Sequence, residues 1–352
     1  MSKKISMKDH KIIAGFCLIY LGVSLVTLRA QPTASTAVQQ IQNVQQSIEQ
    51  QVPLLNLRAG TNAPETYTNE NADIGEQHIL KVIPNPTRWE IDVDSRFFYT
   101  DNATLSQLTV GNPLTSSSVF VNTISAAYAP TPYKLGDGRF APTAGYRVQW
   151  YNYEGKNLPG GTPVSSLDFN AQTAYVGAKY LMPNNWQYFC EFDFTRIVQQ
   201  PEYSIEFYHE YVPLVGIQRL VQVSQNSLIS ASLVADYHFG TVNQLFTAPD
   251  SQDRMDDMLS LAYSWQPIPK IVVQPYYRLT YSRYRFNTAH TAARNDLLNS
   301  FGFSVAYYFT PWLSLQAFDN YDAKTSDDNS FGANQGYRAF DLGLDLTATF
   351  RF

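Results

Sequence analysis

Histidine, cysteine and serine are the residues whose spacing most often reveals a catalytic or metal site, and their spacing here indicates none. The chain has five histidines: His10, His78, His209, His238 and His290. No pair of them forms HxxxH or HExxH, spacings that let two imidazoles bind one zinc ion. The sequence has no His-x-Ser pairing, GxSxG elbow or glycine-rich phosphate loop. We therefore expect no catalytic residues, no cofactor and no metal site.

Four further features also point away from chemistry. The acidic runs 250–257 and 327–329 lack the ligand spacing of a calcium loop, so we interpret them as solvated loop charge. His209 lies on the apolar phase of segment 203–211, which favours an interfacial aromatic role over that of a base. Cys190 also lies on an apolar phase, which predicts an inert, buried thiol.

A larger set of charged residues lies on the polar phase of segments in which polar and apolar residues alternate. Such alternation is typical of β-strands with one polar and one apolar face. Acids outnumber arginines in this set, and its side chains should project to one common side. The set contains Glu90, Asp92, Asp94, Arg96, Arg147, Asp168, Glu191, Asp193, Glu206, Glu210, Asp236, Arg278, Asp341, Asp345 and Arg351.

The alternating segments that carry these charges are unusually long. Strands in soluble sandwiches average about 5–6 residues, and most of the segments here are twice that length. Strands of about 9–11 residues or more suit a tilted crossing of a membrane. We predict twelve strands: 88–100, 118–129, 143–154, 166–181, 186–197, 203–223, 228–240, 257–266, 270–286, 297–309, 312–323 and 338–352.

Short and long links alternate between these strands, as they do between the periplasmic turns and outer loops of membrane barrels. Two segments do not fit this alternation of link lengths directly. The link 130–142 falls on the short side but is long, and 203–223 is one strand only if Pro213 and Gly216 mark a bulge or kink.

Composition narrows the class of protein. Charged residues make up 16% of the 352-residue chain, against about 25% in average proteins. Its 25 basic and 30 acidic residues show no basic excess, which argues against nucleic-acid binding. Only one long apolar run occurs, so the chain is not a polytopic helical membrane protein.

The first 87 residues differ from the rest. Lysines precede the apolar run 12–28, and Ala30 follows it, so residues 1–30 resemble a secretory signal peptide cleaved near Ala30. An uncleaved membrane anchor is the alternative. In residues 31–87, Val38 and Ile41 begin a narrow helical stripe, which predicts a Gln-rich amphipathic helix or short coiled-coil stalk, then a linker, in a periplasmic arm.

The end of the chain carries a family resemblance. Residues 340–352 alternate apolar and polar and finish with Phe350, Arg351 and Phe352. This resembles the closing strand of bacterial outer-membrane β-barrel proteins, in which the last aromatic residue is part of the signal read by the barrel-assembly machinery. The resemblance covers 88–352 and implies an all-β, single antiparallel transmembrane barrel in the outer membrane, in contact with its lipid. A secreted soluble β protein is the competing class.

Two interiors are compatible with the polar phase. Acids and arginines could fill the barrel as an ion-pair network, or unpaired carboxylates could keep a narrow pore wet. We favour the pore: a passive channel for small solutes with mild cation preference, lined by the charged set above. The alternative is a closed structural or adhesive barrel whose loops bind a partner. The sequence does not indicate the oligomeric state.

Overall fold

A computed structural model describes residues 37–42, 88–105, 114–158, 160–200, 206–242, 253–285, 294–327 and 336–352. Outside these residues lie the predicted signal peptide and most of segment 31–87. The strands within them are β1 (Trp89–Thr100), β2 (Ser117–Tyr128), β3 (Tyr133–Leu135), β4 (Gly138–Gly155), β5 (Phe169–Leu181), β6 (Trp186–Gln199), β7 (Glu206–Ser224), β8 (Ser227–Val242), β9 (Arg254–Ile268), β10 (Ile271–Tyr284), β11 (Arg294–Thr310), β12 (Leu313–Ser326) and β13 (Tyr337–Arg351).

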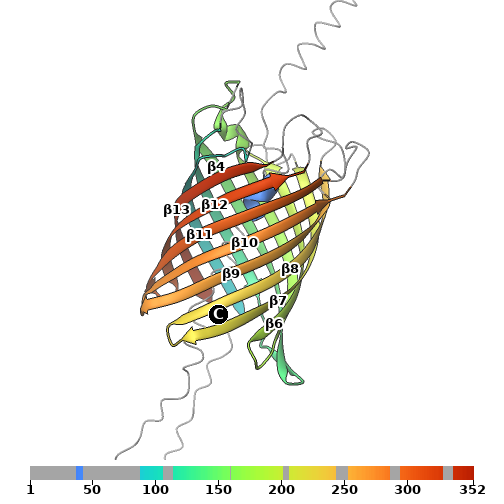
Figure 1. The fold of residues 1–352 in the computed structure, drawn as a ribbon, viewed down its shortest axis with the longest axis vertical. Coiled ribbons are helices and arrows are strands. Elements are labelled where there is room, and N and C mark those ends of the chain that lie inside the picture. Colours follow the sequence, from blue (N-terminus) through green and yellow to red (C-terminus); the bar gives the residue numbers. More distant parts are fainter. Residues whose placement is uncertain are drawn as a thin grey trace, which may run out of the picture.

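The twelve long strands form one closed antiparallel barrel (Figure 1). The first strand, β1, pairs with the last, β13, so that Glu90 lies opposite Arg351 and Thr100 opposite Asp341. On its other side β1 pairs with β2, which pairs with β4. Closure leaves no open edge, so the backbone N–H and C=O groups of every strand can form hydrogen bonds within the protein and need no water. The predicted fold class and strand number are confirmed.

The short links lie at one end of the barrel and the long ones at the other, as predicted. The long link at the short end is explained by β3, which folds back on the start of β4 as a small hairpin. Leu135 pairs with Gly138, and Gly136 between them has φ +57°, a conformation that glycine adopts without strain. This hairpin extends β4 to residue 138 rather than 143.

β7 is a single strand, as the strand count requires, and no bulge lies at Pro213 or Gly216. The pairing of β7 with β8 is interrupted at Pro213, which has no N–H to donate, and resumes with the same offset. Its register shifts lie elsewhere, at Ile197/Val198 with β6 and at Gln222/Ser224 with β8.

The two faces of the barrel are divided as the alternation predicted. Large apolar side chains such as Val93, Phe97 and Leu344 are exposed on the outside, whereas Asp94 and Arg96 between them are buried inside. Trp89, Trp186, Trp265 and Trp312 lie at or next to the short-turn ends of their strands, where membrane barrels place an aromatic girdle. This is the architecture of a transmembrane β-barrel. No helix in the described part of the chain is long and apolar enough to cross a membrane.

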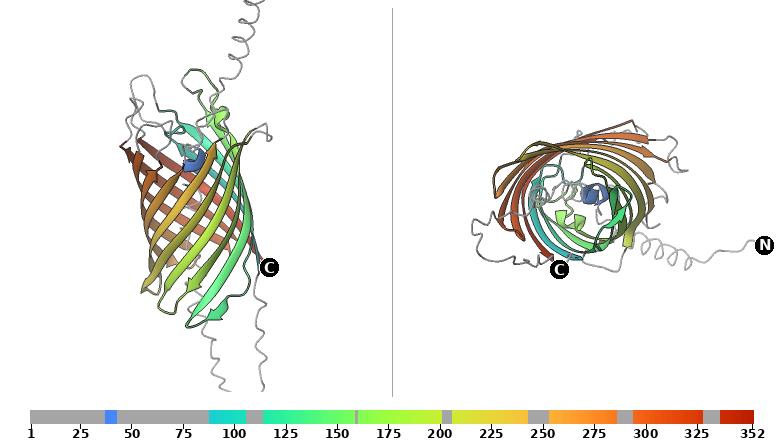
Figure 2. Two further views of the ribbon diagram at one scale, coloured as in Figure 1. Left: turned by 90° about the vertical axis from the view of Figure 1, so that its right-hand side faces the viewer. Right: turned by 90° about the horizontal axis from the view of Figure 1, so that it is seen from below.

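A short helix at residues 37–42 lies inside the barrel, toward the long-loop end (Figure 2). Ala37, Val38 and Ile41 are buried in one cluster with side chains of the barrel wall, including Tyr151. The predicted periplasmic arm is therefore wrong for these six residues. Val38 and Ile41, the first two residues of the stripe, do lie in a helix, but their side chains are covered by the lumen wall.

Candidate functional site

The lumen is the candidate site, because it collects most of the predicted charged residues. Thirteen of them lie on inward-facing strand positions: Glu90, Asp92, Asp94, Arg96, Arg147, Glu191, Asp193, Glu210, Asp236, Arg278, Asp341, Asp345 and Arg351. Asp168 does not, because it follows the 3-10 helix Val164–Leu167 in the loop before β5. Glu206, at the start of β7, also does not face the lumen as the alternation predicted. It forms ion pairs with Arg196 and His209, which face outward.

Near the short-turn end, the acids are partly exposed and bonded to the wall. Glu90 forms an ion pair with Arg351 at 2.5 Å, and both side chains are about two-fifths exposed. Asp92 accepts hydrogen bonds from Thr349 at 2.6 Å and from Ser125 at 3.2 Å. This end of the lumen is therefore acidic and open to solvent.

Halfway along the lumen, charges are buried and paired. The Arg96 guanidinium contacts Asp345 at 2.5 Å, with both side chains at most 4% exposed, and also lies over the Phe318 ring. Asp94 accepts a hydrogen bond from Thr347 at 3.2 Å. This part of the wall has the buried ion pairing of the alternative, filled interior.

Three inward-facing aromatic rings lie flat on the wall instead of crossing the lumen. The Tyr175, Phe189 and Tyr276 side chains each cover a glycine on the neighbouring strand. A Cβ at Gly302 would lie 2.1 Å from the Tyr276 ring, so the ring could not lie there over any other residue. Rings placed in this way take up less of the lumen than rings that point across it.

Toward the long-loop end, the lumen has an apolar wall, and helix 37–42 packs on it. Phe98, Val119, Tyr151 and Phe169 belong to this wall, and the Tyr151 and Phe169 rings stack with centroids 4.3 Å apart. Loop residues also join the cluster from above: Ala103, Leu158, Val164 and Leu167. The long-loop half is therefore occupied, whereas the short-turn half is not occupied by described residues.

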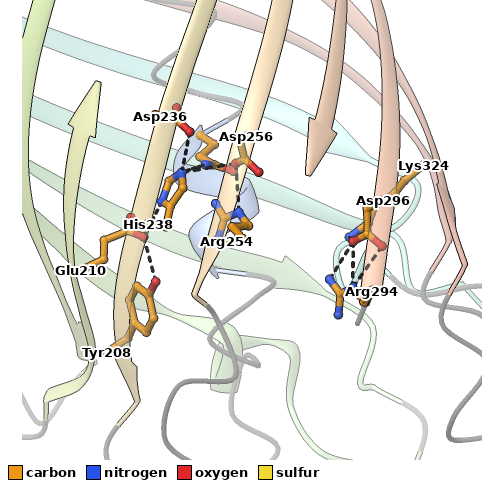
Figure 3. A network of polar contacts seen from close by, with 10 residues as sticks. Tyr208, Glu210, Asp236, His238, Arg254, Asp256, Arg294, Asp296 and Lys324 are labelled. Carbon is orange, nitrogen blue, oxygen red and sulfur yellow. Dashed lines mark hydrogen bonds and ion pairs between the residues drawn. The ribbon is translucent and has the colours of Figure 1, made fainter. Parts of the chain in front are cut away.

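In the same long-loop half, β7, β8 and β9 assemble a buried polar cluster that the sequence pattern did not reveal (Figure 3). His238 lies at its centre, 3% exposed, with Nδ1 2.8 Å from Glu210. Its Nε2 lies 3.3 Å from both Asp236 and Asp256. Arg254 donates to Asp256 at 2.9 Å, and Tyr208 donates to Glu210 at 2.8 Å. These bonds hold the imidazole from both sides.

A second charged cluster lies beside the first, on β11 and β12 (Figure 3). Asp296 contacts Arg294 at 2.7 Å and Lys324 at 2.8 Å. Both clusters begin with an Arg-x-Asp pair at a strand start, Arg254 with Asp256 and Arg294 with Asp296. Residues two apart share one strand face, so this repeated spacing was the available sequence signal.

The remaining predicted residues lie in distinct places. Arg278 is buried and donates to Ser300 at 3.3 Å, and Asp341 is buried on β13. Asp168 accepts a hydrogen bond from the backbone N–H of Tyr153 at 2.7 Å. Burial nevertheless raises the pKa of Asp168 to about 6.

On the outer face, the prediction for Cys190 is wrong, and the surroundings of His209 agree with its predicted role. Cys190 is exposed there, not buried, because its apolar phase faces outward. His209 is surrounded by the outward rings of Phe194 and Tyr211, as an interfacial aromatic residue would be. Phe350 stacks on Trp312 with ring centroids 5.9 Å apart, and the Phe352 backbone bonds to Arg88 and Trp89 across the closing seam.

No protein-family model and no curated protein matches the chain. Solved structures that resemble it include an outer-membrane channel from Pseudomonas putida F1, with 12% identity and a TM-score of 0.48, covering 78% of this chain and 100% of that one. The KdgM porin shares 9% identity, with a TM-score of 0.37 and coverage of 72% and 97%. The transport unit of the autotransporter AIDA-I from Escherichia coli shares 9% identity, with a TM-score of 0.43 and coverage of 79% and 94%. Similarity at this level carries no argument about function.

Proposed function

We propose that the protein is an outer-membrane channel for small polar solutes, occluded in its long-loop half by helix 37–42. The observation that carries this proposal is the division of the lumen into two halves. The short-turn half is acidic and partly exposed, with aromatic rings folded flat on its wall. The long-loop half contains a short segment of the same chain.

Buried polar atoms support a lumen that holds water. Both side-chain amide atoms of Gln149 and the hydroxyl of Thr280 have no hydrogen-bond partner among the described residues. Buried groups of this kind are normally satisfied by protein or by ordered water. A dry, structural interior would leave them unpaired at a cost of about 1–3 kcal/mol each.

We further propose a mild preference for cations, which rests on the partly exposed charges near the short-turn end. Four acids, Glu90, Asp92, Glu191 and Asp193, line this half, and the bases on the same inward phase include Arg147, Lys179 and Arg351. Glu90 is neutralised by Arg351, which leaves an excess of acid on the lumen wall. A ring of one charge sign in a low-dielectric pore enriches counter-ions.

A permanently closed structural or adhesive barrel is the second candidate. It is favoured by the buried Arg96–Asp345 pair and by the apolar packing of helix 37–42, both of which fill space. The two candidates differ in one property, which is whether ions pass when the helix leaves the lumen.

Conductance in planar bilayers separates the two candidates. The full chain should show rare or small conductance steps, and a variant lacking residues 37–42 should show frequent, larger ones. If the deletion variant folds, as judged by heat-modifiable migration, but conducts no ions, the structural function is correct and the channel is not.

Location and assembly are part of the same proposal. The chain is exported, loses a signal peptide near Ala30, and is folded into the outer membrane by the barrel-assembly machinery. Phe350 and Phe352 on the closing strand would supply the assembly signal. Detergent-dependent extraction checks the location, because a protein recovered in a soluble fraction without detergent would not be embedded in lipid.

A further inference from the structure

The polar cluster on β8 and β9 brings three metal-ligating side chains to one point. The donor atoms of Asp236, His238 and Asp256 lie within 4.8 Å of one another. His238 Nε2 is 3.3 Å from Asp236 Oδ1 and 3.3 Å from Asp256 Oδ2. In a tetrahedral site with bonds of about 2.0–2.2 Å, neighbouring ligand atoms lie roughly 3.3–3.6 Å apart. The spacing of these atoms therefore fits one shared cation.

Hydrogen bonding alone does not explain the geometry at His238 Nε2. This nitrogen faces both carboxylates and also the side-chain amide of Gln42, at 3.2 Å. A ring nitrogen carries at most one hydrogen and cannot donate to several neighbours at once. No hydrogen bond of acceptable geometry reaches Asp236 Oδ1 from the described residues, although the Asp236 side chain is only 9% exposed.

The charge of the cluster also favours a cation. Three carboxylates, those of Glu210, Asp236 and Asp256, surround the imidazole, and Arg254 is the basic partner bonded to the cluster. With a neutral imidazole the balance is two negative charges in a nearly fully buried place, which is unfavourable without compensation. The neighbouring Arg294–Asp296–Lys324 cluster carries one net positive charge and offsets part of it. The rest can come from a proton on the imidazole or from a bound metal ion, and titration with a metal ion distinguishes the two.

We propose that Asp236, His238 and Asp256 bind a divalent transition-metal ion of the Zn²⁺ or Co²⁺ class, and that Gln42 completes the site. One imidazole nitrogen with carboxylate oxygens suits these ions, whereas Ca²⁺ and Mg²⁺ prefer oxygen ligands alone. The oxygen and nitrogen of a side-chain amide are nearly interchangeable in position, so the Gln42 carbonyl can face the ion.

The surroundings of the three ligands match those of built metal sites. Metal-binding histidines commonly donate their other ring N–H to a carboxylate, which fixes the ring and its tautomer. Glu210 occupies that position, 2.8 Å from His238 Nδ1, and is itself held by Tyr208. Arg254 similarly fixes Asp256.

The site would join helix 37–42 to the barrel wall. Gln42 belongs to the helix and the other three ligands to β8 and β9. A bound ion would therefore stabilise the occluded arrangement of the lumen. This consequence rests on the proposed function, but the binding site itself does not, because metal binding is measured without any conductance.

Metal binding is tested on the full chain without an affinity tag, in detergent and metal-free buffer. Titration with Co²⁺ should produce visible d–d absorption that saturates at one equivalent, and Zn²⁺ should displace it. His238→Gln and Asp236→Asn should weaken Co²⁺ binding by more than about 100-fold, beyond the range expected for residues that only orient a ligand. Glu210→Gln should weaken it by about 10–100-fold.

Two further variants control for misfolding of the barrel and for metal binding at the outer surface. Gln42→Ala changes the helix and not the barrel, and should weaken binding by about tenfold or more. His209→Ala removes an outer-face histidine and should bind Co²⁺ as the unaltered chain does. The proposal is overturned if the unaltered chain does not bind Co²⁺, if His209→Ala loses binding, or if Glu210→Gln and Gln42→Ala both bind with unchanged affinity.

Discussion

Truncating Ile41 to alanine should release helix 37–42 from the lumen in a measurable fraction of molecules. The Ile41 side chain is 3% exposed and belongs to the apolar cluster on the lumen wall. The substitution removes three carbon atoms, each worth about 0.8 kcal/mol when buried. The docked state should therefore lose about 2.4 kcal/mol, which shifts the docking equilibrium roughly 50-fold.

Such a shift matters because the free energy of docking is a small difference between opposing contributions. Burial of Val38 and Ile41 contributes about 1.5–3 kcal/mol each. The Gln42–His238 contact adds about 0.5–1.5 kcal/mol. Ordering the backbone opposes these gains by about 1–2 kcal/mol per residue. Because each of these contributions is only a few kcal/mol, the loss of about 2.4 kcal/mol at Ile41 is large enough to change the occupied fraction.

Single-channel recording in a planar bilayer measures this fraction directly. Ile41→Ala should raise the open probability without changing the conductance of the open state, because the barrel wall is unaltered. Ile91→Ala is the matched control, because it is the same chemical change at a site away from the helix. The Ile91 side chain is 37% exposed on the outer face. An open probability equal to that of the unaltered chain would refute the reasoning that Ile41 holds the helix in place.

Three other perturbations test separate parts of the structure. Replacing Glu191 with Gln and Asp193 with Asn should move the reversal potential in a salt gradient toward anions, and an unchanged potential would remove the basis for cation preference. Asp345→Asn removes the carboxylate charge from the buried ion pair with Arg96 and should destabilise the barrel by about 3–5 kcal/mol, read from its urea midpoint; an unchanged midpoint would mean that the pair is dispensable. Because the pKa of Asp168 is raised to about 6, its loop should be most stable below about pH 4 and lose that contribution as the pH rises through about 6. Hydrogen exchange of residues 160–168 should show this trend, and Asp168→Asn should flatten it; a trend retained in that variant would assign it to another group.

The barrel itself was predictable because its two faces meet different surroundings. Val93 and Phe97 must face lipid while Asp94 and Arg96 must not, so the period of two persists along every strand. The strand number followed from the alternation of link lengths. The exceptions are local: Pro213 interrupts one ladder without a bulge, and β3 forms a hairpin in a link.

The polar cluster was not predictable to the same extent, because it depends on register. Glu210, His238 and Asp256 come from three strands, and each strand pair can slide in steps that keep the same faces inward. Alternation therefore shows that these side chains point inward but not which of them meet. Only pairs two apart on one strand, such as Arg254 and Asp256, could be recognised from the sequence.

The position of helix 37–42 was ambiguous for a different reason. Val38 and Ile41 lie one turn apart and predict an apolar stripe, but a stripe does not say which surface covers it. A stalk, a mobile arm and a helix inside the barrel share this pattern. The sequence predicts a polar lumen, which would not attract an apolar stripe. The structure shows that part of the lumen wall is apolar and can cover it.

The size of the lumen explains why one short helix suffices to occlude it. A helix with its side chains is about 10–12 Å across, and a twelve-stranded barrel is intermediate between a filled eight-stranded one and an open porin. Ile41 packs in the apolar cluster of the lumen wall, and Gln42, about 100° further around the helix, contacts His238 on β8. The helix is therefore held by one apolar and one polar contact. Any change that moves it must break the apolar contact, the polar contact or both, which makes these two residues the natural points from which passage through the barrel is controlled.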